Sequence, residues 1–595
     1  MTRSWIAAFY IGFVTFGAAA QAEEYRPGDM VVVIADADLL VDQEVVDHVG
    51  PGSVLKVEDI NDTWLWVAAT KPGWLESRNV IPLDRRAIDS LTEMIRRQPR
   101  SARLYDGRAE VWMKLGELDI ALADLNEALR LSPESALYDN RGRIWEAKGE
   151  FDKAIADYDE ALRLDPTSVE AHHNRGMAWY KKRDLDQAIA DFTEAIRLGG
   201  AIALAYSNRG SAWSEKGEYG KALADLDQAL EIDPKLVNAY INRGVVWVDK
   251  NDYDRAIANF DEAAKLDPTN ASVFLDRAIA WRLKGDADKA LADYGECLRL
   301  DPQNAVAYEH RGDVRRSKQD YDKAIADYTE SLRLAPNNVD VYVNRGRAWR
   351  SKQELDKAVA DYDAAIRLDP KAVDAYKFRA DIRKLNRDFE RAIADYDEAI
   401  RLDPKFGNAY LNRGLARAAQ EEFDQAVADF KAALHADPQD ALSQYCVAVA
   451  GMLRRDKAAG EEFRRTIEMK EAPNDVVVSA VIFGNLAGRL AGDDRAAEFL
   501  TKFNDEFKPE WPYPCVEFLR GKLDEAGLLK TAIDQAKLTE VHVVLGLDAL
   551  AKGRTADAKK HLQWAVDEGG RIYVESIIAV VEAARLDRPA AQTKK

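Results

Sequence analysis

Apolar residues recur at three- and four-residue spacing over most of the chain, a pattern that is typical of amphipathic helices. One such stretch runs from Asn242 to Lys250, and after a polar break at Asn251 and Asp252 a second runs from Tyr253 to Leu266. This order of helix, tight turn and helix repeats along the chain. Ahead of the helices, short β-rich runs separated by glycine, proline and aspartate-asparagine turns predict strands at 30–35, 45–49, 54–58 and 64–69.

A 34-residue period organises the helical part. The prolines that mark it are spaced by 34 residues, apart from one interval of 33 and one of 68 in which Gly199-Gly200 end a helix instead. They are Pro133, Pro166, Pro234, Pro268, Pro302, Pro336, Pro370, Pro404 and Pro438. Because one helix pair cannot bury its apolar face alone, about three or more stacked pairs are needed for stability. The period therefore predicts a stack of helix pairs.

The residue types within one unit predict how its two helices touch. Tyr240 and Trp247 share a face of the first helix, and Ala256, Phe260 and Ala263 share a face of the second. We expect the small Ala256 to let the backbones approach while the aromatic rings fill the space between them. The same types return at the matching positions of the other units.

These units resemble tetratricopeptide repeats of the variety Tyr-x-Asn-Arg-Gly, then Trp, then Asp-Tyr-Asp-x-Ala-Ile-Ala-Asp-Tyr, then Leu-Asp-Pro. The resemblance covers ten units from about Ala102 to Pro438, with the helix from Asp84 to Arg97 as an N-terminal cap. It implies a mainly α fold, an α-α superhelix or solenoid. In that family the first helix of each pair forms the concave wall, which mostly binds extended peptides or partner helices.

The units depart from the family pattern by an arginine where leucine is usual. It stands at Arg108, Arg141, Arg175, Arg209, Arg243, Arg277, Arg311, Arg345, Arg379 and Arg413. An acid or amide follows each arginine by sixteen residues, at Asp124, Asp157, Asp191, Asp225, Asn259, Asp293, Asp327, Asp361, Asp395 and Asp429. Arginine suits bidentate carboxylate contacts, so we expect ion pairs within or between repeats. The alternative is that the arginines bind a ligand. Exposed pairs would contribute only about 0–1 kcal/mol each.

The chain divides into six predicted segments: a signal peptide at 1–22, a β domain at 23–83, the capping helix at 84–101, ten repeats at 102–439, degenerate helical repeats at 440–510 and a C-terminal helical region with one repeat-like unit at 511–595. In the first segment a positive Arg3 precedes an apolar stretch and the small residues Ala20-Gln21-Ala22. This predicts export to the periplasm or the medium. A retained membrane anchor is the alternative, although the apolar stretch is short for a span of about 20 residues.

The β domain ends on Trp64-Leu65-Trp66-Val67 and Gly73-Trp74-Leu75, which resemble the last strands of bacterial SH3-like domains. The resemblance implies a small β-barrel and an aromatic surface of Trp64, Trp66 and Trp74 for wall peptides or proline-rich segments. The alternative is that the three tryptophans are core residues, since large aromatics are usually well buried.

Composition narrows the function classes. A formal net charge of −19 argues against nucleic acid as a partner, because phosphate backbones need a basic face. With 3 cysteines and 7 histidines and no metal-ligand spacing, we expect no metal site and no cofactor. Cys297 replaces a small alanine of a second helix, and we expect it to be buried packing. No catalytic motif is found, so we assign no catalytic residue.

Two sets of residues are candidates for the groove. Asparagines stand one position before the arginine at Asn140, Asn174, Asn208, Asn242, Asn344 and Asn412. The resemblance implies that such asparagines hold a peptide backbone, whereas the alternative is bonding within the helix or to a neighbouring repeat. Asp276, His310 and Phe378 interrupt the set, so we expect the second to fifth units to give the best continuous track. A basic stripe recurs every 34 residues at Arg282, Arg316, Arg350 and Lys384. It suits an acidic partner segment, unless it is a solvated face balanced by nearby acids.

The sequence thus favours an exported scaffold that binds peptides or partner proteins in the concave groove, with a possible cell-wall contact through the SH3-like domain and no membrane span once the signal is removed. A structural spacer without a groove ligand, or a hydrolase that uses the C-terminal region, are the alternatives. We expect a binding protein and not an enzyme.

Overall fold

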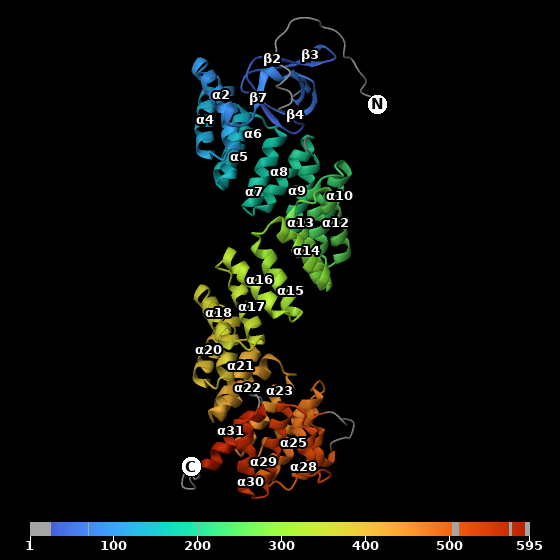
Figure 1. Cartoon of the computed structure of the whole chain (residues 1–595), viewed down its shortest axis with the longest axis vertical. Helices are drawn as coiled ribbons and strands as arrows, with labels where there is room; N and C mark the ends of the chain where they lie inside the picture. The colour runs from blue at the N-terminus through green and yellow to red at the C-terminus, as the bar shows by residue number, and fades with distance from the viewer. Residues whose placement is uncertain (1–24, 70, 200–201, 503–510, 570–573, 589–595) are drawn as a thin grey trace. The chain divides into compact units, whose positions relative to one another are not determined.

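The computed structural model describes residues 25–69, 71–199, 202–502, 511–569 and 574–588 (Figure 1). The predicted signal peptide at 1–22 lies outside these residues. The chain forms two compact units, residues 1–293 and 294–595. In the described part of the chain, none of the helices is both long and apolar enough to cross a membrane.

The N-terminal domain is one antiparallel sheet of seven strands in the order β3-β2-β6-β5-β4-β1-β7. The strands are β1 (Met30–Val33), β2 (Ala37–Val41), β3 (Glu44–Val49), β4 (Val54–Asn61), β5 (Trp64–Ala68), β6 (Gly73–Glu76) and β7 (Val80–Pro82). Alternate residues such as Leu65 and Val67 turn inward and are fully buried. The prediction of a small β domain is confirmed, and the structure adds β2, β6 and β7 to the predicted strands.

The sheet is joined to the first helices by close packing. Val32 of β1 shares a buried cluster with Leu91 of α2 (Arg85–Arg97), whose N-terminus is capped by the carboxylate of Asp84. The β3–β4 turn contacts the first repeat helix, where an added Cβ at Gly107 would lie 2.2 Å from the carbonyl oxygen of Gly52. Only glycine fits at that contact, so the β domain is seated directly on the start of the repeats.

Ten helix pairs follow, as the 34-residue period predicts. The first helices are α3 (Ala102–Lys114), α5 (Ser135–Ala147), α7 (Val169–Lys181), α9 (Ile202–Glu215), α11 (Val237–Asp249), α13 (Ala271–Lys284), α15 (Ala305–Ser317), α17 (Val339–Ser351), α19 (Val373–Leu385) and α21 (Gly407–Ala419). The second helices are α4 (Leu118–Leu131), α6 (Phe151–Leu164), α8 (Leu185–Leu198), α10 (Tyr219–Ile232), α12 (Tyr253–Leu266), α14 (Ala287–Leu300), α16 (Tyr321–Leu334), α18 (Leu355–Leu368), α20 (Phe389–Leu402) and α22 (Phe423–Ala436). The mainly α repeat fold is confirmed.

Inside a pair, a glycine of the first helix meets a large ring of the second. An added Cβ at Gly346 would lie 2.6 Å from the ring of Tyr362, and Gly244 stands in the same relation to Phe260. Ala256, Phe260 and Ala263 are fully buried, as predicted from the spacing. Cys297 is fully buried as well, which confirms its interpretation as a packing residue.

The recurring arginines make the predicted ion pairs. Arg345 donates from Nη2 and Nε to the two carboxylate oxygens of Asp361 at 2.7 and 2.9 Å, and Arg243 donates to Asn259 in the one repeat with an amide. A third donor, Nη1 of Arg345, reaches Thr329 of the preceding second helix at 3.1 Å. Such bridges recur at Thr92, Asn126, Asp159, Thr193, Asp227, Asp261, Asp363 and Asp397. Each of these arginines therefore ties its own helix pair together and links it to the one before.

These pairs are not surface pairs, and the estimate made for exposed pairs does not apply to them. The side chain of Asp361 is only 8% exposed and that of Arg345 only 19%. A buried carboxylate left without its cation is costly. Removing one partner of such a pair should therefore destabilise the stack.

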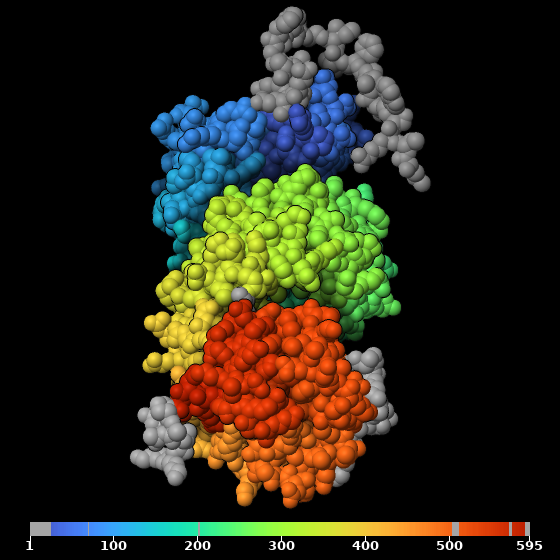
Figure 2. All heavy atoms as spheres, turned by 60° about the horizontal axis from the view of Figure 1, so that its bottom comes forward, coloured from blue at the N-terminus to red at the C-terminus, as the bar shows by residue number. Residues whose placement is uncertain are grey.

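The last helices close the second unit. They are α23 (Ala441–Leu453), α24 (Ala459–Glu468), α25 (Asn474–Ala491), α26 (Ala496–Lys502), α27 (Tyr513–Leu519), α28 (Glu525–Thr531), α29 (Gln535–Ala551), α30 (Thr555–Asp567) and α31 (Val574–Asp587). Helix α31 packs on α21 and α23, and Arg455 forms an ion pair with Glu582 at 2.6 Å. In Figure 2 the red surface of the final helices lies directly against the orange surface of the helices before them.

Replacing Arg345 with alanine should destabilise its repeat by about 3 kcal/mol, because Asp361 would remain buried without a cation. The matched control is Arg333→Ala on α16, whose exposed pair with Glu330 should contribute less than about 1 kcal/mol. Hydrogen exchange of the α17 and α18 amides measures both, since opening in a repeat stack is local. Equal protection in the two variants would show that the bridging pairs add nothing to stability.

Candidate functional site

The first helices stand beside one another in series and form a wall in each unit. In the first unit α5, α7, α9, α11 and α13 are in contact one after the next, and in the second unit α15, α17, α19, α21 and α23 are. We call the face that these helices present together the first-helix wall. It carries the residue one position before each recurring arginine and the residues two and five positions after it.

The predicted asparagines of the first unit bond across this wall. Asn140 donates to Asp106 at 2.9 Å, Asn174 to Asp139 at 3.0 Å and Asn242 to the hydroxyl of Ser207 at 3.2 Å, and each partner belongs to the preceding first helix. Asn208 lies 3.4 Å from the ring nitrogen of His173 in the same way. Burial raises the pKa of Asp106 to about 6 and also raises that of Asp139. The asparagines therefore link neighbouring repeats, and a role in holding a ligand stays a prediction.

The asparagines of the second unit differ from these. Asn412 donates to the carbonyl oxygen of Asn408 in its own helix at 2.8 Å, and its own oxygen accepts from Lys384 at 2.5 Å. Asn344 is half-buried on α17. Because Lys384 belongs to α19 and Asn412 to α21, the structure places five of the six asparagines in bonds between repeats.

The four residues of the predicted basic stripe have different surroundings. Arg282 lies on α13 of the first unit. Lys384 is buried against Asn412, and burial lowers the pKa of its ammonium group. Arg316 and Arg350 both line a cavity in the second unit, so only this pair is brought together at one opening.

That cavity, which we call the basic cavity, has a volume of about 410 Å³. It opens between α15, α17, α18 and α19, and its lining is Arg316, Arg347, Arg350, Ser351, Gln353, Leu355, Phe378 and Leu385. The guanidinium carbon of Arg347 lies 5.2 Å from the centre of the Phe378 ring. Arg347 was not predicted as a site residue, and Phe378 was noted only as an interruption of the asparagines.

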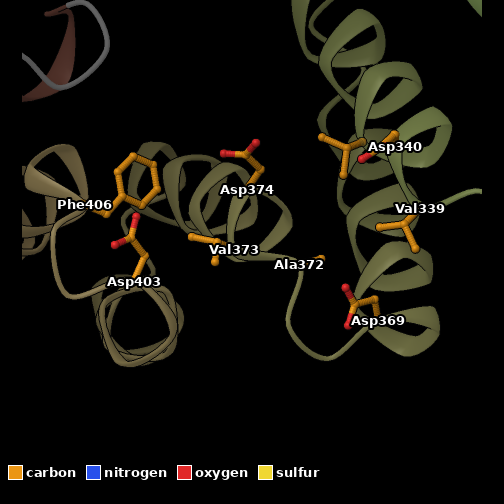
Figure 3. Close-up of a pocket in the computed structure, with 9 residues that line it drawn as sticks. Val339, Asp340, Asp369, Ala372, Val373, Asp374, Asp403 and Phe406 are labelled. Carbon is orange, nitrogen blue, oxygen red and sulfur yellow. The ribbon is translucent and has the colours of Figure 1, made fainter. Parts of the chain in front are cut away.

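A second cavity, the acidic cavity, lies on the same helices toward their N-termini. Its volume is about 560 Å³, and it is lined by Val339, Asp340, Val343, Asp369, Ala372, Val373, Asp374, Asp403 and Phe406. Figure 3 shows that Asp340 and Asp374 come from α17 and α19, while Asp369 and Asp403 stand at the ends of α18 and α20. Backbone amides of Lys371 and Lys405 donate to the latter two. The wall of the second unit therefore carries opposite charges at its two edges.

The tryptophans of the β domain lie on the outer face of the sheet. Trp66 and Trp74 pair across β5 and β6 with ring centres 5.4 Å apart, and Trp64 is on the same face. All three are half-buried, whereas Leu65 and Val67 between them are fully buried. Their interpretation as core residues is wrong, because the strand alternation turns the aliphatic side chains inward instead.

The C-terminal helices bury two glutamates. The indole of Trp511 donates to Glu540 at 2.7 Å, and the hydroxyl of Tyr445 donates to Glu575 at 3.2 Å. Burial and the nearby Glu575 raise the pKa of Glu540 to about 8. Neither glutamate lines the basic or the acidic cavity. Among the described residues of the same region, His561 also lies 3.4 Å from Glu525 and 3.1 Å from a ring nitrogen of His542.

Comparisons with known sequences agree with the repeat architecture. A model of the tetratricopeptide repeat matches residues 85–136, 243–305, 310–373 and 379–441. Further models of the same repeat match residues 142–183, 169–200 and 203–236. The matches together begin at the capping helix and end with the tenth pair.

Several solved structures resemble parts of the chain. A tetratricopeptide repeat protein from Parabacteroides merdae is 19% identical, with 44% of this chain and 99% of that one covered and a TM-score of 0.36. Yeast Tom70 is 17% identical, with 68% and 99% covered and a TM-score of 0.32. YrrB, described as a TPR protein with an unusual peptide-binding site, is 22% identical, with 31% and 95% covered and a TM-score of 0.26.

The assignment rests on the sequence models and on the helix pairs themselves. The models match segments between residues 85 and 441, and over that range first and second helices alternate, with a buried alanine on each second helix and the recurring arginine on each first helix. The chain belongs to the tetratricopeptide repeat family.

Proposed function

We propose that the chain is a protein-interaction scaffold that binds an extended segment of a partner protein along the first-helix wall. The observation that supports this most directly is the difference in charge pairing between the two kinds of helix. On the second helices, exposed cations are neutralised one turn away, as Arg299 is by Glu296 and Arg333 by Glu330. On the wall of the second unit, arginines gather at one cavity and aspartates at another.

The energetics fit a binding surface that uses many weak contacts. One hydrogen bond contributes only about 1 kcal/mol, so a usable affinity needs several repeats engaged together. A wall that continues through five contacting first helices provides them. The final helix α31 packs on α21 and α23. The two cavities are lined mainly by residues of α17 and α19, which precede those helices in the wall.

We propose binding without catalysis. The groups gathered at the two cavities are arginines, aspartates and apolar side chains, and a nucleophile held by a base is not among their lining residues. The buried glutamates of the C-terminal helices are held by Trp511 and Tyr445. The hydrolase reading would require turnover by a chain from which the repeats had been deleted.

Groove binding predicts where a partner becomes attached to the chain. A photoreactive residue at Asn344 on α17 should form adducts with partner protein, whereas the same residue at Ala326, exposed on the second helix α16, should not. Adducts are resolved by electrophoresis and mass spectrometry after irradiation of the chain in an envelope extract. A spacer would give none from either position.

The asparagines provide a second arm of the same experiment. Changing Asn174, Asn208 and Asn242 together to alanine should weaken capture of any partner that spans the first unit. Capture of every partner at the original level would show that these residues serve only the contacts between repeats.

We propose export from the cytoplasm, to the periplasm or the medium, on the basis of Arg3, the apolar stretch and the small residues at 20–22. N-terminal sequencing of chain recovered from a bacterial host should begin near Glu23. An intact Met1 in the membrane fraction would instead identify a retained anchor.

We propose that the β domain contacts a cell-wall component through Trp64, Trp66 and Trp74. Aromatic rings on the outer face of a sheet can pack on the flat faces of sugars or on proline-rich segments. The double variant Trp66→Ala and Trp74→Ala should lose most of its sedimentation with isolated wall sacculi, while Leu115→Ala, an exposed change on the repeats, should keep it. Unchanged sedimentation of the double variant would end this part of the proposal.

A further inference from the structure

We propose that the basic cavity is a carboxylate site, which takes the side chain of an aspartate or glutamate in the segment bound along the wall. The proposal rests on the proposed function, because the acidic side chain is delivered by a bound polypeptide. It adds the chemical class of the ligand residue and the groups that receive it.

The arginines of the cavity lack enough acid around them. Arg316 is bonded through Nε to a neutral group, the Tyr328 hydroxyl, at 3.3 Å. Arg350 has one carboxylate, Asp381, at 3.5 Å, and that carboxylate is shared with Lys377 at 2.9 Å. Within the described residues, Arg347 has no carboxylate at ion-pair distance, and its guanidinium lies over the Phe378 ring. A ring under one face leaves the N–H groups at the guanidinium edge free to donate.

The buried tyrosines of other repeats show which group the repeat of Arg347 and Arg350 does not have at the matching positions. The hydroxyl of Tyr328 donates to Asp313 at 2.7 Å and that of Tyr396 to Asp381 at 2.7 Å, two positions after the recurring arginine of their repeats. The hydroxyl of Tyr158 donates to Glu146, five positions after it, at 3.2 Å. In these three repeats the wall thus supplies a carboxylate to the tyrosine.

Tyr362, in the repeat between those of Tyr328 and Tyr396, differs from these three tyrosines. The two positions that carry the carboxylate elsewhere are Arg347, 34 residues after Asp313, and Arg350. The side chain of Tyr362 is fully buried, and in the described part of the chain its hydroxyl has no hydrogen-bond partner. The repeat of Tyr362 therefore has two arginines at the positions where the repeats of the three other tyrosines have an acid. Buried hydroxyls normally form a hydrogen bond. At the positions where the repeats of Tyr328 and Tyr158 carry an acid, this repeat thus presents arginines, which suit a carboxylate supplied by a ligand.

The shape of the cavity fits an acidic side chain. Its volume of about 410 Å³ exceeds what a single carboxylate needs, and Leu355, Leu385 and Phe378 offer apolar contacts for methylene groups. Phe378 is held in place by stacking on Tyr362, with ring centres 5.8 Å apart. The arginines are thereby fixed around the opening, so a carboxylate can accept from two of them at once.

The acidic cavity narrows the class of ligand. It lies along α17 at about 16 Å from Arg350, which is the length of 11 residues at about 1.5 Å per residue. Asp340, Asp374 and Asp403 would repel a second anion there. Polyanions such as nucleic acids are therefore disfavoured, and the ligand is a polypeptide with an acidic residue at one end of its contact and neutral or basic residues toward the other.

Random peptides of about 12 residues, which at about 3.3 Å per residue span both cavities, test the proposal when they are selected on the full mature chain. We expect the selected peptides to share one Asp or Glu. Changing that residue to Gln or Asn should raise Kd about 10-fold or more on the wild-type chain, as expected for loss of a charge-assisted pair. The Arg347→Gln variant should bind the acidic peptide as weakly as wild type binds the neutral one, with little further loss for the neutral peptide.

Controls separate this proposal from the broader one. Arg333→Gln, on the exposed face of α16, should leave Kd unchanged, and circular dichroism checks that each variant is folded. If no peptide is selected at all, groove binding itself fails. If peptides are selected but tolerate the neutral change on wild-type chain, the carboxylate site is overturned while the scaffold stands. That last measurement needs no variant protein, so it holds even if Arg347→Gln does not fold.

Discussion

The packing of a small residue of the first helix, glycine or alanine, against a large side chain of the second is the contact on which the stack of helix pairs depends. An added Cβ at Gly346 would lie 2.6 Å from Tyr362, which brings the two backbones nearer than any larger residue allows. Successive pairs repeat this packing, and within each unit their first helices contact one another in series. The wall is a consequence of that packing and not of any interaction between wall residues and a partner.

The same rings connect the core to the wall. A tyrosine at this position packs its ring against a small residue of the first helix, as Tyr362 does against Gly346. In the repeats of Tyr158, Tyr328 and Tyr396 its hydroxyl donates to a carboxylate two or five positions beyond the recurring arginine. A phenylalanine at this position, as in Phe260, has no hydroxyl and needs no acceptor. Within the described residues, the hydroxyl of Tyr362 has no hydrogen-bond partner.

Much of this architecture could be predicted from the sequence, because its signals are periodic along one dimension. The proline period, the arginine and its partner sixteen residues later, and the Ala256 and Phe260 spacing each specify a contact that recurs in every pair. The basic cavity could not be predicted in this way, because its lining residues come from four helices. In addition, its arginines depart from the residue types that other repeats carry at the same positions. Arg347 is notable only once Tyr362 is known to lie beside it. The sequence likewise left open whether Trp66 faces outward, since alternation separates two faces without saying which of them is inside.

Opposite charges at the two edges of one wall do more for selection than either alone. A basic cavity within a chain of net charge −19 gains nothing from long-range attraction of anions, because the overall field opposes them. Recognition of an acidic residue must then come from short-range pairing with Arg347 and Arg350, where desolvated donors are strong. The aspartates of the acidic cavity add a penalty for further negative charge, so polyacidic segments are excluded by the same helices that accept a single acid. Affinity for one carboxylate and rejection of many thus follow from a single pair of neighbouring first helices, α17 and α19.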